Sequence, residues 1–203
     1  LGGNRLLWED CEVTAVELDP ELARMYQERF PNDTVIVGDA HQYLLDHYKE
    51  FDFIWSSPPC PTHSRARYWG SKGNPEKVKP VYPGMELYQE IIFLKNWVDC
   101  KWVVENVVPY YFPLIHPSNN LGRHLFWSNF TIPFFKVIDA NIKEGNTKEW
   151  SDFHKVDVSS YKGTQRKDKI LRNLVHYETG KHIFNLAKGI VEDNNKEQTK
   201  LDL

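Results

Sequence analysis

Two short apolar segments constrain the fold of this chain more than any other feature. Residues 51–56 and 102–108 are almost wholly apolar and have the length of strands, which indicates two buried strands. The first leads into Pro58 and Pro59, so the chain leaves the strand in a rigid turn. Strand-like segments alternate with helical spacing through the first half of the chain. This alternation predicts an α/β fold, in which helices cover both faces of a parallel sheet.

The same periodicities give the remaining elements. We expect Gly2 and Gly3 to form a turn that enters a helix, and Asp19 to cap the helix that begins next to Pro20. Residues 139–164 are polar and aperiodic, which predicts a loop or a small insert. The expected strands are 13–17, 34–39, 51–56 and 102–108, followed by an antiparallel ending at 124–130 and 134–138. The expected helices are 21–30, 42–48, 85–97 and 169–188, the last broken near Gly180.

The composition fits one domain with its own core, because 41% of the 203 residues are hydrophobic. No apolar run reaches membrane-spanning length and no signal peptide is visible, so we expect a soluble, cytoplasmic protein. Cys11, Cys60 and Cys100 are too widely spaced for a disulfide framework or a metal-ligand pattern, which predicts no metal site.

The chain has a net charge of −3, so any contact with nucleic acid has to come from local basic patches. One patch lies within residues 63–82 and the other within 162–181. Each is equally compatible with solvated surface. The first follows Cys60 and contains glycines and aromatic residues, and we expect it to be a mobile loop that closes over a phosphate backbone.

A thiol and a carboxyl group at the two apolar segments carry the candidate chemistry. Cys60 follows the prolines at a strand end, and Glu105 interrupts the second apolar segment. A buried carboxyl group is costly unless it has a partner or a function. The pair therefore suggests a nucleophile with an acid beside it. Plainer interpretations remain: a small buried apolar side chain for Cys60, and a structural carboxylate for Glu105.

Two motifs resemble those of the cytosine-C5 methyltransferases, which use S-adenosylmethionine as methyl donor. They are the Pro-Cys pair at 59–60 and the Glu-Asn-Val triplet at 105–107. Other family motifs follow in the family's order, from the Gly-Gly pair at 2–3 to Asn-Leu-Val at 173–175. The resemblance implies a Rossmann-like methyltransferase sheet with antiparallel C-terminal strands. It also implies a double-stranded DNA substrate from which a cytosine is flipped out, and we expect a monomer.

The resemblance also assigns roles to residues. Cys60 would add as thiolate to C6 of cytosine, Glu105 would protonate N3, and Arg123 would bond the carbonyl oxygen, although a plain surface arginine remains equally open. The implied cofactor-binding residues are Gly2, Gly3, Glu17, Leu18, Asp39, Ala40, Pro58, Asn173 and Val175. For Glu17 and Asp39 the alternative is capping of the following helix. The implied nucleic-acid-binding residues are Ser64, Arg65, Arg67, Lys72, Asn106, Lys162 and Arg166.

The implied catalytic domain comprises residues 1–131 and 166–191. A target-recognition insert at 132–165 and a flexible tail at 192–203 complete the chain. The insert is far shorter than in the family, which predicts a very short or degenerate target site. The family's first strand is expected before Gly2 and is missing from this sequence.

Departures from the family and rival functions complete the interpretation. Pro61 replaces the usual glutamine after Cys60, and Tyr177 replaces a proline of the last motif. A tRNA cytosine methyltransferase is one alternative, although the Cys-Phe-Thr tripeptide of that branch is absent. An amino-group methyltransferase would carry an aromatic residue in place of Cys60. A catalytically silent DNA-binding homologue is the third alternative. The biological role stays open among restriction-modification, anti-restriction and regulation.

Overall fold

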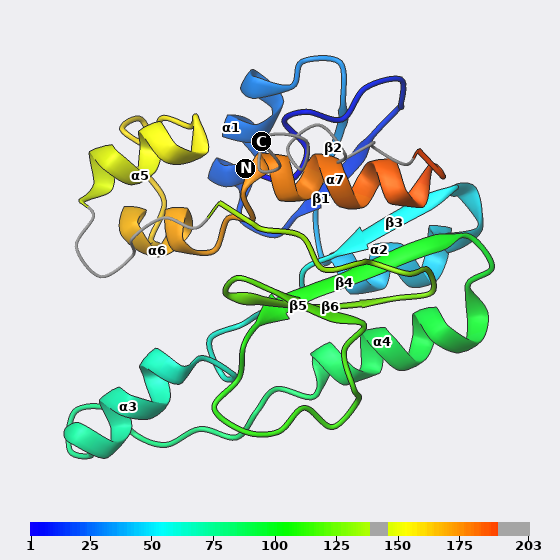
Figure 1. Ribbon diagram of the computed structural model, residues 1–203. Helices are drawn as coiled ribbons and strands as arrows, with labels where there is room; N and C mark the ends of the chain where they lie inside the picture. The colour runs from blue at the N-terminus through cyan, green and yellow to red at the C-terminus, as the bar shows by residue number, and fades with distance from the viewer. Residues whose placement is uncertain (139–145, 191–203) are drawn as a thin grey trace, which may run out of the picture.

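The computed structural model describes residues 1–138 and 146–190, and it has a mixed α/β architecture built on two open sheets (Figure 1). In the first sheet, β1 (Thr14–Glu17) pairs in parallel with β2 (Thr34–Val37). The second sheet has the strand order β3-β4-β6-β5. Its strands are β3 (Phe53–Ser56), β4 (Lys101–Val107), β5 (Asn119–Leu121) and β6 (His124–Ser128). Strand β3 is parallel to β4, whereas β4, β6 and β5 are antiparallel neighbours.

A large cavity separates the two sheets. Its volume is about 2090 Å³, and every residue of β1 and of β3 contributes to its lining. Within residues 1–138 and 146–190, no hydrogen-bonded ladder connects the two sheets. The strand ends of both sheets therefore face one shared space, which is where the candidate site lies.

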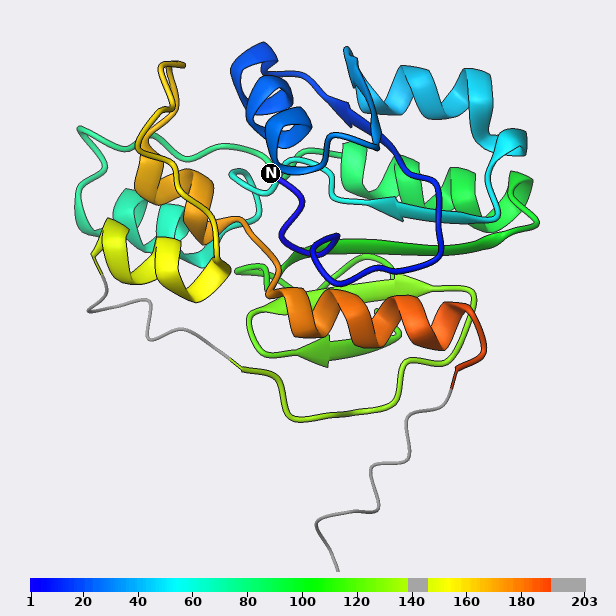
Figure 2. The same cartoon turned by 90° about the horizontal axis from the view of Figure 1, so that it is seen from above.

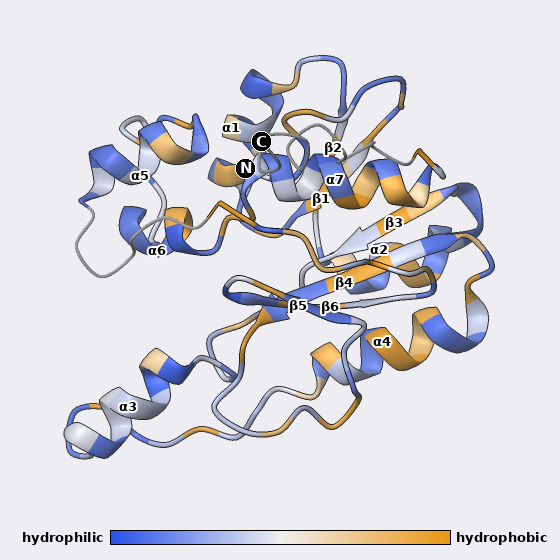
Figure 3. Ribbon diagram, in the orientation of Figure 1, coloured by the Kyte–Doolittle hydropathy of each residue, from blue (hydrophilic) through white to orange (hydrophobic). Residues whose placement is uncertain are grey.

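Helices on opposite sides bury the two faces of β3 and β4 (Figure 2). Helix α4 (Glu86–Trp97) packs its apolar side chains against alternate residues of β4, such as Trp102 and Val104. Helix α7 (Tyr177–Ala187) covers the other face, where Ile183 meets Val103. The period of two along a strand explains this division, since successive side chains point to opposite faces. Figure 3 shows the apolar residues gathered on β3, β4 and α4.

The helices next to the first sheet begin at aspartates that close each strand-to-helix turn. The Asp19 side chain accepts hydrogen bonds from two backbone N–H groups of α1 (Pro20–Arg29). Asp39 does the same for α2 (Ala40–His47), which continues into the short 3-10 helix η1 (Tyr48–Glu50). These carboxylates satisfy N–H groups that the helix itself leaves unpaired.

Two C-terminal helices form a second small core with α1. They are α5 (Thr147–His154) and α6 (Lys167–Arg172). Trp150 and Leu171 pack there with Leu22. The Tyr161 hydroxyl donates to Asp19 Oδ2 at 2.6 Å and ties this region to the first turn of α1. The segment expected to be a target-recognition insert is thus packed against the first sheet's helix.

Several expected elements are wrong. Residues 5–8 form hydrogen-bonded turns in place of a helix, and residues 134–138 form no strand. Phe135 and Val137 nevertheless pack into the core at a strand-like period, but the segment has no ladder partner. The antiparallel partner of β6 is instead β5, which precedes it.

Three further expectations about loops and breaks are also corrected. The expected mobile loop after Cys60 begins with a helix, α3 (Arg65–Gly73), and α5 lies in the segment expected to be irregular. The C-terminal helical segment is broken at residues 173–176, between α6 and α7, and continues through Gly180. That glycine allows a close approach, because a Cβ there would lie 2.2 Å from the Asn4 carbonyl oxygen. The expected tail, 192–203, lies outside the described residues.

Candidate active site

Cys60 lies in the turn that follows β3, with its thiol at the cavity between the sheets. The turn is closed by the backbone N–H groups of His63 and Ser64, which donate to the Cys60 carbonyl oxygen at 3.0 and 3.2 Å. The Sγ atom lies 3.6 Å from Asn173 Oδ1, at the end of α6. The fold thus brings together Cys60 and a residue 113 positions later in the sequence.

Glu105 lies inside β4 and lines the same cavity. Only 6% of the residue is exposed, and this burial raises the pKa of the carboxyl group to about 7, although a hydrogen bond from Ser57 and the charge of Arg123 act in the other direction. His124 Nε2 lies 3.5 Å from Glu105 Oε1. Burial also lowers the pKa of His124 to about 3, so the imidazole is neutral. Glu105 can therefore hold a proton near neutral pH.

Burial and the Glu105 carboxylate raise the pKa of the Cys60 thiol to about 11. The protein without substrate consequently presents a protonated thiol at neutral pH. Deprotonated Glu105 opposes formation of a thiolate, whereas protonated Glu105 does not. The two groups are coupled, and the acid form of Glu105 is the one compatible with a nucleophilic Cys60.

All nine residues expected to bind cofactor line the cavity that Cys60 and Glu105 share. Glu17 ends β1, and its Oε1 accepts a hydrogen bond from the Asp19 backbone N–H at 3.2 Å. Asp39 caps α2 through Oδ1, to which the N–H groups of His41 and Gln42 donate. The capping role is thus present, and both bonds use the same carboxylate oxygen of Asp39. Leu18 is exposed beside Glu17.

Gly2 and Gly3 have packing reasons of their own. Gly2 has a φ of +62°, and its Cβ would lie 2.6 Å from the Phe30 ring. A Cβ on Gly3 would lie 2.7 Å from the Val175 carbonyl oxygen. The structure therefore explains both glycines by contacts within the protein, in addition to the close approach to a cofactor that we expected.

Arg123 lies beside the large cavity but does not line it, unlike its neighbour His124. Both residues line a small second cavity of about 20 Å³, but only His124 also lines the large cavity. Arg123 Nη2 donates to the Arg172 carbonyl oxygen at 3.4 Å. Its charge reaches Glu105, whose pKa it lowers, so the arginine acts on the site electrostatically.

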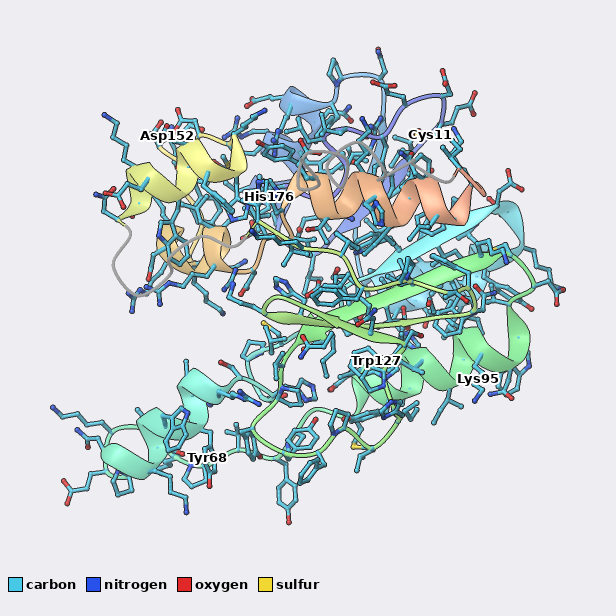
Figure 4. All side chains as sticks on the ribbon, in the orientation of Figure 1. Cys11, Tyr68, Lys95, Trp127, Asp152 and His176 are labelled. Carbon is cyan, nitrogen blue, oxygen red and sulfur yellow. The ribbon has the colours of Figure 1, made fainter. Side chains whose placement is uncertain are left out.

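The residues expected to contact nucleic acid divide into two groups. Most are exposed or at the surface, on α3 and next to α6, and both helices lie beyond the end of β3 that leads to Cys60 (Figures 1 and 2). Arg166 donates twice to Asp168, at 3.0 and 2.9 Å. Figure 4 shows Tyr68 on α3. The Nζ atom of Lys72 lies 5.7 Å from the centroid of the Tyr68 ring. Arg65 Nε donates to the Pro109 carbonyl oxygen at 3.0 Å.

Asn106 is buried, and its amide is hydrogen-bonded inside the protein. It is 1% exposed, its Nδ2 donates to the Pro58 carbonyl oxygen at 2.9 Å, and its Oδ1 accepts from the Val107 N–H. The amide is consequently used inside the protein, where it connects β4 to the turn that carries Cys60. The expected contact of Asn106 with nucleic acid stays a prediction.

Two buried polar residues of the cavity were not identified from the sequence. Glu90 on α4 accepts a hydrogen bond from Ser56 Oγ at 2.7 Å and contacts His41 Nδ1. His124 contacts Glu105 across the β4–β6 pair. The sequence signal that could have found such residues is a polar residue at a position where the apolar period of a helix or strand predicts burial. Glu90 stands at such a position in the helical spacing of α4.

No helix in residues 1–138 and 146–190 is both long and apolar enough to cross a membrane. The same residues contain no group of three or more His, Cys, Asp or Glu side chains arranged to hold a metal ion.

Comparison with known proteins agrees with the motif at 59–60. The family model described as C-5 cytosine-specific DNA methylase matches residues 1–96, which include β1 to α3, all of α4 except its last residue, and Cys60. No curated protein matches the chain. Glu105 and Asn173 lie beyond the matched residues, and it is the fold that brings them to the cavity of Cys60. Over residues 1–96 the chain is similar to the C-5 cytosine-specific DNA methylase family.

Proposed function

We propose that this protein is a DNA (cytosine-5-)-methyltransferase that forms a covalent adduct between Cys60 and a flipped cytosine. The observation that carries the proposal is the shared cavity. One space is lined by the Cys60 thiol, by the buried carboxyl group of Glu105 and by carboxylates at the ends of β1 and β2. The match of residues 1–96 to the cytosine-C5 family supports the same chemistry. We further propose that the two sheets are parts of one Rossmann-like methyltransferase sheet.

The first sheet fits S-adenosylmethionine. Glu17 and Asp39 stand at the carboxyl ends of parallel strands, where α/β folds bind nucleosides. Glu17 would accept hydrogen bonds from ribose hydroxyls. The Asp39 Oδ2 atom, which the capping bonds do not use, would accept one from the adenine amino group. When bound, S-adenosylmethionine supplies an electrophilic methyl group.

The second sheet supplies the groups that activate cytosine. Cys60 Sγ would release its proton to solvent and bond to C6 as thiolate, while Glu105 would give its proton to N3. C5 would then be enamine-like, and transfer of the methyl group to it would leave S-adenosylhomocysteine. Loss of the C5 proton then accompanies breakage of the Sγ–C6 bond. With a pKa of about 7, Glu105 can hold its proton until N3 arrives. The protonated form also removes the negative charge that opposes the thiolate.

The cytosine has to leave the base stack, because its C6 is inaccessible inside a duplex. The basic side chains of α3 follow Cys60 directly and would contact the phosphate backbone. The segment 132–165 is short, and the buried side chains of its described part, such as Trp150 and Tyr161, pack with α1 and cannot read base edges. We therefore propose recognition of a very short or degenerate site.

Trapping with a 5-fluorocytosine duplex tests the proposal. The fluorine cannot leave as a proton does, so the enzyme should accumulate as a covalent adduct with the DNA when S-adenosylmethionine is present. The Cys60→Ser variant should form no adduct, while Cys100→Ser provides a matched control. Absence of an adduct with the parent protein would contradict the covalent mechanism.

A second arm separates the possible substrates. Transfer of a labelled methyl group is measured to duplex DNA and to tRNA under the same conditions. Transfer to DNA supports the proposal, whereas transfer to tRNA alone would replace it by the tRNA enzyme. Binding of DNA without transfer to either substrate would indicate a silent homologue.

A further inference from the structure

His63 lies in the turn that carries Cys60, but its ring points away from solvent and is 1% exposed. Its Nδ1 atom lies 2.5 Å from the hydroxyl of Tyr111, a residue of the segment that follows β4. Tyr111 in turn accepts a hydrogen bond from Tyr88, which is buried on α4, at 3.1 Å. The imidazole thus connects three parts of the fold at the base of the Cys60 turn.

The donors in this chain of hydrogen bonds run in one direction. The Leu114 N–H donates to the Tyr88 hydroxyl at 3.1 Å, Tyr88 donates to Tyr111, and the Tyr111 proton is left for His63 Nδ1. In this arrangement Nδ1 accepts and the ring proton is on Nε2, which is buried and has no hydrogen-bond partner among the described residues. Burial lowers the pKa of His63, which agrees with this neutral form.

Backbone contacts join the same two segments. The Tyr110 N–H donates to the His63 carbonyl oxygen at 3.2 Å, and Ser64 forms an isolated bridge with Pro109. The His63 N–H itself donates to the Cys60 carbonyl oxygen at 3.0 Å. The turn after β3 is consequently held to the chain that leaves β4, the strand that contains Glu105.

We propose that His63 is a positioning residue, which through Tyr111 fixes the turn that holds the Cys60 thiol opposite Glu105. This inference rests on the proposed function for its catalytic meaning. The physical reason is geometric. A misplacement of about 1 Å between reacting groups can reduce a rate by about 10²-fold. A buried hydrogen bond at the base of the turn restricts such displacement.

Amide variants that place an acceptor at different distances from the backbone test the contact. In His63→Asn, Oδ1 takes the place of Nδ1 and can still accept from Tyr111, whereas the polar atoms of His63→Gln lie one bond farther out. We expect His63→Gln and Tyr111→Phe to slow adduct formation with a 5-fluorocytosine duplex about 10–100-fold. His63→Asn should stay within a few-fold of the parent. The double variant His63→Gln/Tyr111→Phe should be no slower than either single variant.

Alkylation of Cys60 by iodoacetamide, without DNA or cofactor, separates this inference from the proposed function. The other two cysteines are replaced by serine for this assay. Release of the turn should make the half-buried thiol react several-fold faster in His63→Gln and Tyr111→Phe, although adduct formation becomes slower. S-adenosylhomocysteine binding should match that of the parent, and each variant should still unfold in one cooperative transition, at a somewhat lower temperature because a hydrogen bond is lost. Tyr48→Phe, which removes a hydroxyl from a tyrosine packed on Phe93, is the matched control.

Two results would overturn the positioning role. One is equal behaviour of His63→Asn and His63→Gln in both assays, and the other is multiplication of the two single effects in the double variant. If the parent protein forms no adduct, the proposed function fails. The alkylation rates of the variants still decide whether His63 positions Cys60.

Discussion

Replacement of Glu105 by glutamine should abolish most activity and yet stabilise the folded protein above neutral pH. The carboxyl group has a pKa of about 7 in the folded protein, against 4.5 for the unperturbed group. Between pH 4.5 and 7 the folded protein keeps Glu105 protonated, whereas the unfolded chain has released this proton. The free energy of unfolding therefore falls as the pH rises through this window. Each pH unit in that window costs about 1.4 kcal/mol. The stability present below pH 4.5 is thus reduced by about 3 kcal/mol once the pH exceeds 7.

Glutamine has nearly the same shape and no charge to bury. At pH 8.5, Glu105→Gln should therefore unfold about 6–12 °C above the parent protein, since about 1 kcal/mol corresponds to about 2–4 °C for a chain of this size. At pH 4.5 the two proteins should unfold at similar temperatures. Methyl transfer at saturating DNA should fall by about 10²–10⁴-fold, because an amide cannot protonate N3.

Calorimetric unfolding at both pH values measures the effect, and Glu76→Gln, at an exposed position, controls for the loss of one negative charge. A difference in unfolding temperature that is the same at pH 4.5 and 8.5 would refute the reasoning. It would mean that Glu105 does not carry the cost of a buried ionised carboxylate. Unchanged methyl transfer would separately refute its role as acid.

Three further outcomes follow from the contacts described above. Alkylation of Cys60 should accelerate about tenfold per pH unit between pH 7 and 10, because the thiol has a pKa of about 11; a rate independent of pH would contradict the raised pKa. Tyr161→Phe should cost about 1–2 kcal/mol in urea unfolding, since Asp19 loses a charge-assisted hydrogen bond, and an unchanged midpoint would show that this bond contributes nothing. Arg67→Glu should weaken DNA binding and lower the slope of log affinity against log salt by about one, without affecting S-adenosylhomocysteine; an unchanged slope would place Arg67 outside the DNA contact.

The elements that position the site could be predicted from the sequence because they depend on local patterns. The apolar runs of β3 and β4 and the cap at Asp19 are set by neighbouring residues, and the turn after Pro59 follows from proline geometry. Cys60 at a strand end and Glu105 within the next apolar segment were expected to form a nucleophile with an acid beside it. The structure places both at one cavity.

Other features depend on contacts between residues that are distant in the sequence. The three residues of β5 are too few to show a period, and Gly180 continues a helix because Asn4 lies against it. Nothing near His63 in the sequence indicates its bond to Tyr111, 48 residues later. The internal use of the Asn106 amide was hidden for the same reason, since its acceptor is the Pro58 carbonyl group.

The division into two sheets has a consequence for how the protein opens. Each sheet has its own ladder of hydrogen bonds, and in the described residues no ladder passes from β1 to β3. The amide hydrogens of β1 and those of β4 should then exchange with solvent through separate opening events with different free energies. A ligand held by Glu17 on one side and reaching Cys60 on the other would connect the two cooperative units across the cavity. Its binding should appear as slower exchange in both sheets together, including in strands that it does not touch.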